Sequence, residues 1–256
     1  MKYKFHVPTQ QYGFLEIEGE ESELSDMENK YNYYAETPVK FKSGNRVELK
    51  AFVGGSVFYD AEAHVYTNEA GEVYLSGSQY ADTFRKPFDK VAISNLMANK
   101  VEGVNAEDIV KMWELKSQVS MDFGNSIHKA LQLYEQYKGL AELLNKETHQ
   151  HDHPIIKQAV DSFLTLHKGE TALSEVMVVD NTAKHAGQID RLVILDKNIK
   201  VCRVEDFKTN AEMKPADLEV YWKQLDFYGQ ILRAGGWKVE KPRIHHYNGV
   251  WKEYQK

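Results

Sequence analysis

Apolar and polar residues follow two different periods along the second half of the chain. A period of two, which is typical of half-buried strands, occurs in three stretches, and a helical period with a wide apolar side occurs before and after them. The dipeptide Asn248-Gly249 is a hairpin signal. The predicted elements are a helix at 154–166, strands at about 173–179, 187–195 and 200–208, a helix at about 216–234, and a final strand or hairpin. This order predicts a mixed α/β fold with a central mixed sheet flanked by helices.

Upstream of this core, a long helix is predicted over 105–137, with Asn105 as its N-cap. Gly124 lies inside it, and a helical glycine costs about 1 kcal/mol relative to alanine. Either a neighbouring segment or a ligand approaches the helix there, or the chain breaks between two helices. Apolar and polar residues alternate on both sides of the sequence NEAG, which predicts a hairpin within 56–75. Ser76 and Ser78 then indicate the start of a helix.

Residues 1–48 are predicted to form a small accessory unit, and 49–256 the main domain. The runs KYKFHV and FLEIEGE are expected to pair as strands, 24–34 to form a short helix, and 39–49 to form a strand or turn. The tyrosines near position 33 are assigned to packing rather than to base stacking, because Lys30 is the one basic residue among them. A docking or oligomerisation role is the hypothesis for this unit.

The strand VCRVEDFKT carries the candidate chemistry. Side chains alternate between the faces of a strand, so Asp206 and Lys208 share a face and Glu205 points away from it. Across the turn at Asn198, Asp190 can lie opposite Asp206. Two converging carboxylates repel each other unless a cation lies between them, and oxygen ligands favour Mg²⁺ or Mn²⁺. Taken alone, however, the D-x-K triplet indicates a surface ion pair at a strand end.

Further residues change that interpretation. His128 lies on the long upstream helix, while Gln224 and Tyr228 lie one turn apart on the helix that follows the strand. In chain order, His128, Glu175 in LSEVMVV, Asp190 in GQID, Asp206 and Lys208 in DFK, and Gln224 and Tyr228 in QLDFY resemble the motifs of the PD-(D/E)xK nuclease superfamily, specifically its RecB-like exonuclease branch. The resemblance extends from about Trp113 to the end of the sequence.

The resemblance implies a restriction-endonuclease-like core of order αβββαβ with N-terminal additions. It implies that His128, Asp190 and Asp206 hold the metal, that the Phe207 carbonyl adds a ligand, and that Lys208 serves the attacking water. Gln224 and Tyr228 are expected to contact DNA and support the site. Glu175 is a further candidate, which can equally be a solvated residue of an edge strand.

The function implied by the resemblance is a Mg²⁺- or Mn²⁺-dependent deoxyribonuclease, an exonuclease of DNA recombination or repair of phage or bacterial type. The expected partners are DNA, a single-strand-binding or annealing protein, and further copies of the chain. The alternative is a catalytically silent nuclease fold that binds DNA or protein.

Composition narrows these possibilities. With one cysteine, Cys202, in 256 residues, the chain has neither an internal disulfide nor the thiolates for an iron–sulfur cluster. No apolar run is long enough for a membrane span, so a cytoplasmic location is expected. The net charge of −6 does not favour binding to DNA, although many of the acidic residues are concentrated in residues 15–30. His149, His151 and His153 alternate in a predicted loop, which does not match a zinc-binding spacing.

Overall fold

The computed structural model describes residues 2–8, 14–20, 39–42, 46–60, 63–86, 88–143 and 153–256, with side chains from residue 46 onward except those of 137–143. Its strands are β1 (Lys2–Pro8), β2 (Phe14–Glu20), β3 (Val39–Lys42), β4 (Arg46–Lys50), β5 (Ser56–Asp60), β6 (Val65–Thr67), β7 (Val73–Ser76), β8 (Ala172–Asp180), β9 (His185–Asp196), β10 (Val201–Lys208), β11 (Lys238–Val239), β12 (Arg243–Tyr247) and β13 (Trp251–Gln255). Its helices are α2 (Gly77–Asp82), α3 (Lys90–Ala98), α4 (Ala106–Leu143), α5 (Pro154–Leu166) and α6 (Pro215–Ala234).

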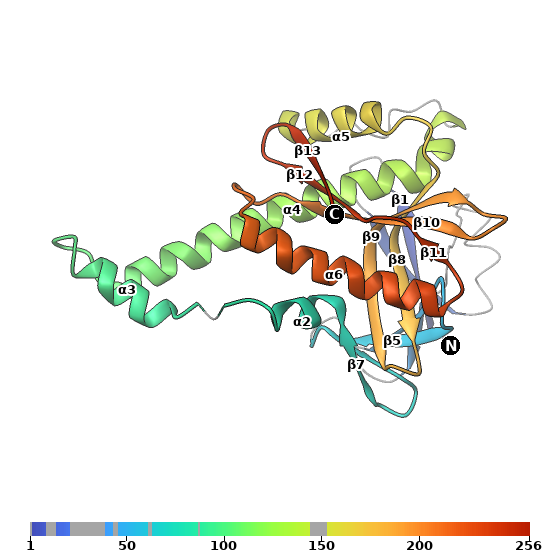
Figure 1. Ribbon diagram of the computed structural model, residues 1–256, viewed down its shortest axis with the longest axis horizontal. Helices are drawn as coiled ribbons and strands as arrows, with labels where there is room; N and C mark the ends of the chain where they lie inside the picture. Colours follow the sequence, from blue (N-terminus) through green and yellow to red (C-terminus); the bar gives the residue numbers. More distant parts are fainter. Residues whose placement is uncertain are drawn as a thin grey trace.

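The described strands form one mixed sheet (Figure 1). Its path runs β13-β12-β10-β9-β7-β6-β5-β4-β3-β1-β2, with β8 paired to β9 and β11 paired to β10. Strand β10 is antiparallel to β9 and parallel to β12, because α6 carries the chain back across the sheet between β10 and β12. The predicted order of helix, three strands, helix and final hairpin is confirmed, and so is the mixed α/β class with helices flanking a central sheet.

Helices cover both faces of the central strands. On one face, Leu225 and Ile231 of α6 pack with Cys202 and Val204 of β10 in the larger apolar cluster. On the other face, α4 and α5 pack against Phe207 and the β12–β13 hairpin through a second cluster. Because β10 is covered on both sides, all of its residues from Cys202 to Phe207 are buried, including the charged ones.

Helix α4 is continuous over 38 residues, so the alternative of a break at Gly124 is wrong. A Cβ atom at Gly124 would lie 2.7 Å from Oγ1 of Thr209, just beyond β10. The expected close approach of a neighbouring segment is therefore confirmed. The predicted N-cap is also present, since the Asn105 side chain accepts the Asp108 N–H at 2.8 Å.

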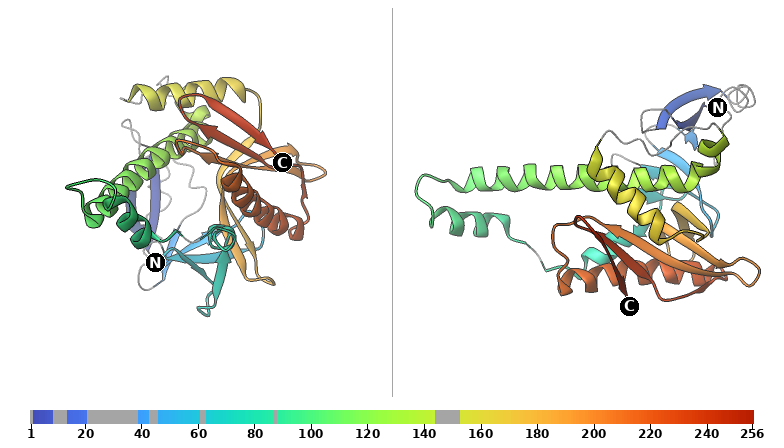
Figure 2. Two further views of the ribbon diagram at one scale, coloured as in Figure 1. Left: turned by 60° about the vertical axis from the view of Figure 1, so that its left-hand side comes forward. Right: turned by 90° about the horizontal axis from the view of Figure 1, so that it is seen from above.

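The first half of α4 and the whole of α3 extend beyond the sheet (Figure 2). Helix α3 was not predicted, because its sequence KVAISNLMA has little polar–apolar asymmetry and its apolar residues Val91 and Leu96 stay exposed. The 56–75 stretch contains the expected hairpin at NEAG, formed by β6 and β7, and a further strand, β5. Ser76 caps α2 in a capping box with Gln79, as its position predicted.

Strands β1 and β2 pair as expected, and the 39–49 stretch, expected to be a strand or turn, forms the two paired strands β3 and β4. They continue the sheet through β4 and β5, and residue 48, the expected unit boundary, lies inside β4. Whether residues 1–48 act as a separate unit stays a prediction. The helix expected at 24–34 and most of the histidine-rich loop at 148–154 lie outside the described residues. None of the helices in the described ranges has an apolar stretch long enough to cross a membrane.

Candidate metal centre

Side chains from α4, β8 and β9 converge near the carboxyl end of β10. His128, Glu175 and Asp190 each offer one ligand atom, and these three atoms lie within 4.8 Å of one another. His128 comes from the helix that crosses this end of the sheet, where its ring also lies edge-on to Phe207 at 5.5 Å. One imidazole and two carboxylates in a half-buried position are a donor set that a divalent cation can use.

Asp190 joins the strands to the helix. Its Oδ2 atom accepts the backbone N–H of Phe207 at 2.9 Å and lies 3.7 Å from Nδ1 of His128. The antiparallel pairing of β9 and β10 matches Arg191 with Glu205, so the next residues, Asp190 and Asp206, come opposite each other. The expectation from strand periodicity that these two carboxylates face each other is confirmed.

Asp206 and Lys208 form an ion pair on the site face of β10. Nζ of Lys208 lies 2.5 Å from Oδ2 of Asp206, whose side chain is only 3% exposed. Burial raises the pKa of Asp206; Lys208 opposes this rise, and the Asp190 carboxylate adds to it. Burial alone would lower the pKa of Lys208, but the two carboxylates raise it above its usual range. The lysine is therefore held as a cation beside two crowded acids.

Glu175 belongs to the cluster, contrary to the alternative of a solvated strand residue. Burial raises its pKa, and the Asp190 and Asp206 carboxylates raise it further. Its φ of 53° is left-handed, which is unusual for a residue other than glycine. In the β8–β9 pairing, Ser174 is opposite Arg191 and Val176 is opposite Ile189, and Glu175 lies between these two pairs. Such local strain often occurs at functional sites.

Helix α6 supplies the other wall of the site. Nε2 of Gln224 donates to the Tyr228 hydroxyl at 3.3 Å, so the two predicted residues do contact each other. Tyr228 is buried, and two glycines make room for its ring. A Cβ atom at Gly77 or Gly187 would lie 2.5 Å or 2.6 Å from Tyr228 Cε1. The glycine in the GQID sequence thus lets the α6 tyrosine reach the strand that carries Asp190.

Two residues near the site were not among the sequence-based candidates. The Tyr221 ring centroid lies 4.6 Å from Nζ of Lys208, and the guanidinium carbon of Arg85 lies 5.5 Å from the same ring. The helical spacing of Tyr221, three residues before Gln224 and seven before Tyr228, is a signal that could have identified Tyr221. The position of Arg85 beside Tyr221 could not be derived from the sequence, because the end of α2 is brought to α6 only by the tertiary fold.

Glu205 lies on the opposite face, as strand periodicity predicted. Its carboxylate binds Arg191 and Arg203 at 2.5 Å each and His245 at 2.9 Å. His245 and His246 are buried residues of β12. Trp251 of β13 donates its indole N–H to the Ala159 carbonyl at 2.7 Å.

A family model described as the PD-(D/E)XK nuclease superfamily matches residues 98–250 of the chain. Among solved structures, the crystal structure of SSO0001 is similar with 18% identity and a TM-score of 0.28, over 50% of this chain and 65% of that one. The chain therefore spans about two thirds of that relative's length. No curated protein matches. The mixed sheet flanked by helices is consistent with the restriction-endonuclease-like fold of the matched superfamily.

Proposed function

The chain belongs to the PD-(D/E)XK nuclease superfamily, and from this premise we propose that it is a Mg²⁺- or Mn²⁺-dependent deoxyribonuclease that hydrolyses phosphodiester bonds with water. The observation that carries the proposal is the convergence of His128, Glu175 and Asp190 beside the Asp206–Lys208 ion pair. Superfamily membership describes the fold, whereas the presence of both acids, the lysine and the imidazole in one place supports an active enzyme.

The residues divide into three roles in this proposal. Asp190, Asp206 and His128 would hold the cation, with Glu175 beside them and the Phe207 carbonyl as a further ligand. When bound, the cation supplies Lewis acidity toward the phosphate and lowers the pKa of an attacking water. Lys208, kept charged by its two acidic neighbours, orients that water or stabilises the negative charge that develops on the phosphate.

Residues of α6 and α2 would bind and position the DNA. Gln224 and Tyr228 support the site from the α6 side through their hydrogen bond. Arg85 and Lys223 lie over the Tyr221 and Phe84 rings, at 5.5 Å and 5.2 Å. In this proposal Arg85 and Lys223 contact phosphates beside the acidic centre, and Arg85 also pairs with Asp82 at 2.8 Å.

The finer assignment is part of the same proposal. The QLDFY pair and the order of the motifs resemble the RecB-like branch, which favours an exonuclease of recombination or repair in the cytoplasm of a bacterium or a phage-infected host. An oligomer that encircles DNA, or a single-strand-binding or annealing partner, would compensate for the net charge of −6.

A cleavage assay tests the proposal. Purified full-length protein should degrade end-labelled linear DNA with Mn²⁺ or Mg²⁺ and leave it intact with chelator. Asp190→Asn and Asp206→Asn remove charge without changing shape, and Lys208→Ala removes the cation. Each should reduce the rate by about 10²-fold or more. Glu240→Gln, at an exposed carboxylate away from the site, is the matched control.

Two outcomes would contradict the proposal. If the Asn and Ala variants cleave as fast as the parent protein, the activity comes from a contaminant. If the parent protein binds DNA but never cleaves it with either metal, the chain is a silent binding module. Covalently closed circles in the same assay separate exonuclease from endonuclease action, because an exonuclease needs a free end.

A further inference from the structure

A second group of metal-ligating side chains lies on the other face of the sheet. His167 follows the end of α5, His245 lies in β12 and Glu253 lies in β13, and their ligand atoms are within 4.8 Å of one another. The part of the chain that the structure describes contains two such groups, and the other is the candidate metal centre. Asp206 and Glu205 project to opposite faces of β10, so the Asp206 carboxylate and the Glu205 carboxylate that binds His245 lie on opposite sides of the sheet.

The backbone fixes the positions of these three side chains. In the antiparallel β12–β13 pair, His245 is directly opposite Glu253, so their side chains share a face. The His167 ring lies 4.7 Å from the His245 ring. Phe163, which is fully buried in α5, stacks on His167 at 4.2 Å and meets His245 edge-on at 5.1 Å. Packing therefore holds both rings in place.

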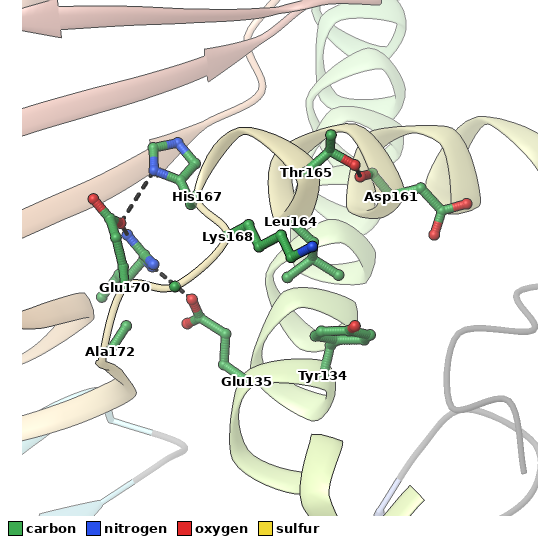
Figure 3. A pocket seen from close by; sticks show the side chains of 11 residues that line it. Tyr134, Glu135, Asp161, Leu164, Thr165, His167, Lys168, Glu170 and Ala172 are labelled. Atoms are coloured by element: carbon green, nitrogen blue, oxygen red, sulfur yellow. Dashed lines mark hydrogen bonds and ion pairs between the residues drawn. The ribbon is translucent and has the colours of Figure 1, made fainter. Parts of the chain in front are cut away.

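One nitrogen of each imidazole is already held by a carboxylate. Nδ1 of His167 lies 3.1 Å from Glu170 Oε2, as Figure 3 shows, and Nε2 of His245 lies 2.9 Å from Glu205 Oε2. These bonds leave Nε2 of His167 and Nδ1 of His245 for a ligand role. A carboxylate that fixes the second nitrogen of an imidazole is the usual outer shell of a protein-bound metal.

The charges around the group are compatible with a cation. The carboxylates outnumber the guanidinium groups that pair with them, with Glu135, Glu170, Glu205 and Glu253 on one side and Arg191, Arg203 and Arg243 on the other.

Access comes from the β13 side. The Glu253 side chain is 32% exposed, and its partners Arg243 and Gln255 lie on the same exposed hairpin. Each of its oxygens retains a second lone pair beyond those bonds. The group therefore opens to solvent at Glu253, while His167 is half-buried and His245 is buried.

From this arrangement we propose that His167, His245 and Glu253 bind one Zn²⁺ or a similar borderline transition ion. Two imidazoles and one carboxylate with an open fourth position suit zinc rather than Mg²⁺, which favours oxygen ligands. The ion would tie the end of α5 to the β12–β13 hairpin, whereas the candidate metal centre lies across the sheet. The proposal is independent of nuclease activity.

The test uses tag-free, full-length Asp190→Asn protein, in which the first site is weakened. After chelator treatment it is titrated with Zn²⁺, and bound metal is counted; Co²⁺ absorption reports the coordination geometry. We expect one equivalent of Zn²⁺ and a tetrahedral or five-coordinate Co²⁺ spectrum. Adding Glu253→Gln or His167→Asn should weaken binding at least tenfold.

Controls separate this site from other sources of binding. Glu240→Gln, and replacement of His149, His151 and His153 by asparagine, should leave the Zn²⁺ stoichiometry and affinity unchanged. Glu253 is at the surface, so its variant should keep its far-ultraviolet circular dichroism spectrum. The proposal is overturned if Asp190→Asn protein binds no Zn²⁺, or if Glu253→Gln and His167→Asn proteins bind it as tightly as their parent.

Discussion

Adjacent acids in β10 have opposite electrostatic environments. Asp206 faces other carboxylates, and its pKa is raised by burial, with Lys208 opposing the rise and Asp190 adding to it. Burial also favours a raised pKa for Glu205, yet its bond to His245 and the charges of Arg191 and Arg203 hold that pKa below its usual range. Asp206 therefore lies where a cation would be stabilising, and Glu205 is already neutralised by protein cations.

Glu205→Gln should destabilise the protein by about 1–3 kcal/mol, because it removes a buried carboxylate that binds Arg191 and Arg203, while Glu170 still pairs with both arginines. Urea unfolding of full-length protein measures the change. The exposed Glu240→Gln should differ from the parent by less than about 0.5 kcal/mol. A loss below 1 kcal/mol for Glu205→Gln would show that the network rearranges around the amide.

Tyr221 provides a second prediction at the residue scale. Its ring lies against the Lys208 ammonium, and a cation–π contact contributes about 0.5–2 kcal/mol. Tyr221→Leu should therefore slow DNA cleavage by about 2- to 30-fold, mainly in kcat. Tyr221→Phe keeps the aromatic face and should retain most of the rate. Equal losses in the two variants would assign the effect to the hydroxyl instead.

At the scale of elements, α4 determines where His128 lies. At Gly124 there is little room for a side chain, because Thr209, in the segment after β10, approaches the helix there. The same segment follows directly on Lys208. The distance between α4 and β10, and hence between the imidazole and the strand acids, depends on this contact between a glycine and a threonine.

A double-mutant cycle tests this contact. Gly124→Ala would place Cβ 2.7 Å from Thr209 Oγ1, so it should destabilise the protein by about 1–3 kcal/mol and reduce cleavage. Thr209→Ala removes that oxygen, and the Thr209 Cβ would then lie 3.9 Å away. The double variant should regain stability, with up to about 1 kcal/mol added by helix propensity.

Gly229→Ala in α6 is the control for the cycle, since the atom its Cβ would meet is the flexible end of Arg233. It should be neutral or stabilising. If the double variant is as unstable as Gly124→Ala alone, the threonine is not the limiting neighbour of the helix.

At the scale of the whole molecule, the fold brings Glu175 and Asp190 together with His128 at one end of the sheet, beside the Asp206–Lys208 ion pair. Binding of a divalent ion to the native state alone should raise the free energy of unfolding by about 2.7 kcal/mol at a hundred times its Kd. For a chain of 256 residues this corresponds to a rise in Tm of about 5–10 °C. Differential scanning fluorimetry with Mn²⁺ measures it.

Asp190→Asn should lose most of that Mn²⁺-dependent rise, and Glu240→Gln should keep it. A rise of the same size in both variants would mean that Mn²⁺ binds elsewhere, and the candidate metal centre would then need another explanation.

Several local features could be predicted from sequence because each depends on near neighbours. Strand periodicity placed Asp206 and Lys208 on one face and Glu205 on the other, and the turn at Asn198 brought Asp190 opposite Asp206. A proline at the first helical position marks the start of α5 and of α6. The superfamily itself could be recognised from motif order, since residues of a site keep their order when the chain around them varies.

Other features needed the tertiary structure because they join distant segments. Nothing in LSEVMVV indicates that Glu175 takes a left-handed conformation and joins His128, since that depends on how β8 pairs with β9. Arg85 reaches Tyr221 only through the packing of α2 on α6. His167, His245 and Glu253 are separated by up to 86 positions in sequence, and α5 and the final hairpin bring them together. Sequence determined which chemistry VCRVEDFKT could perform, and packing decided which carboxylates remain for a metal.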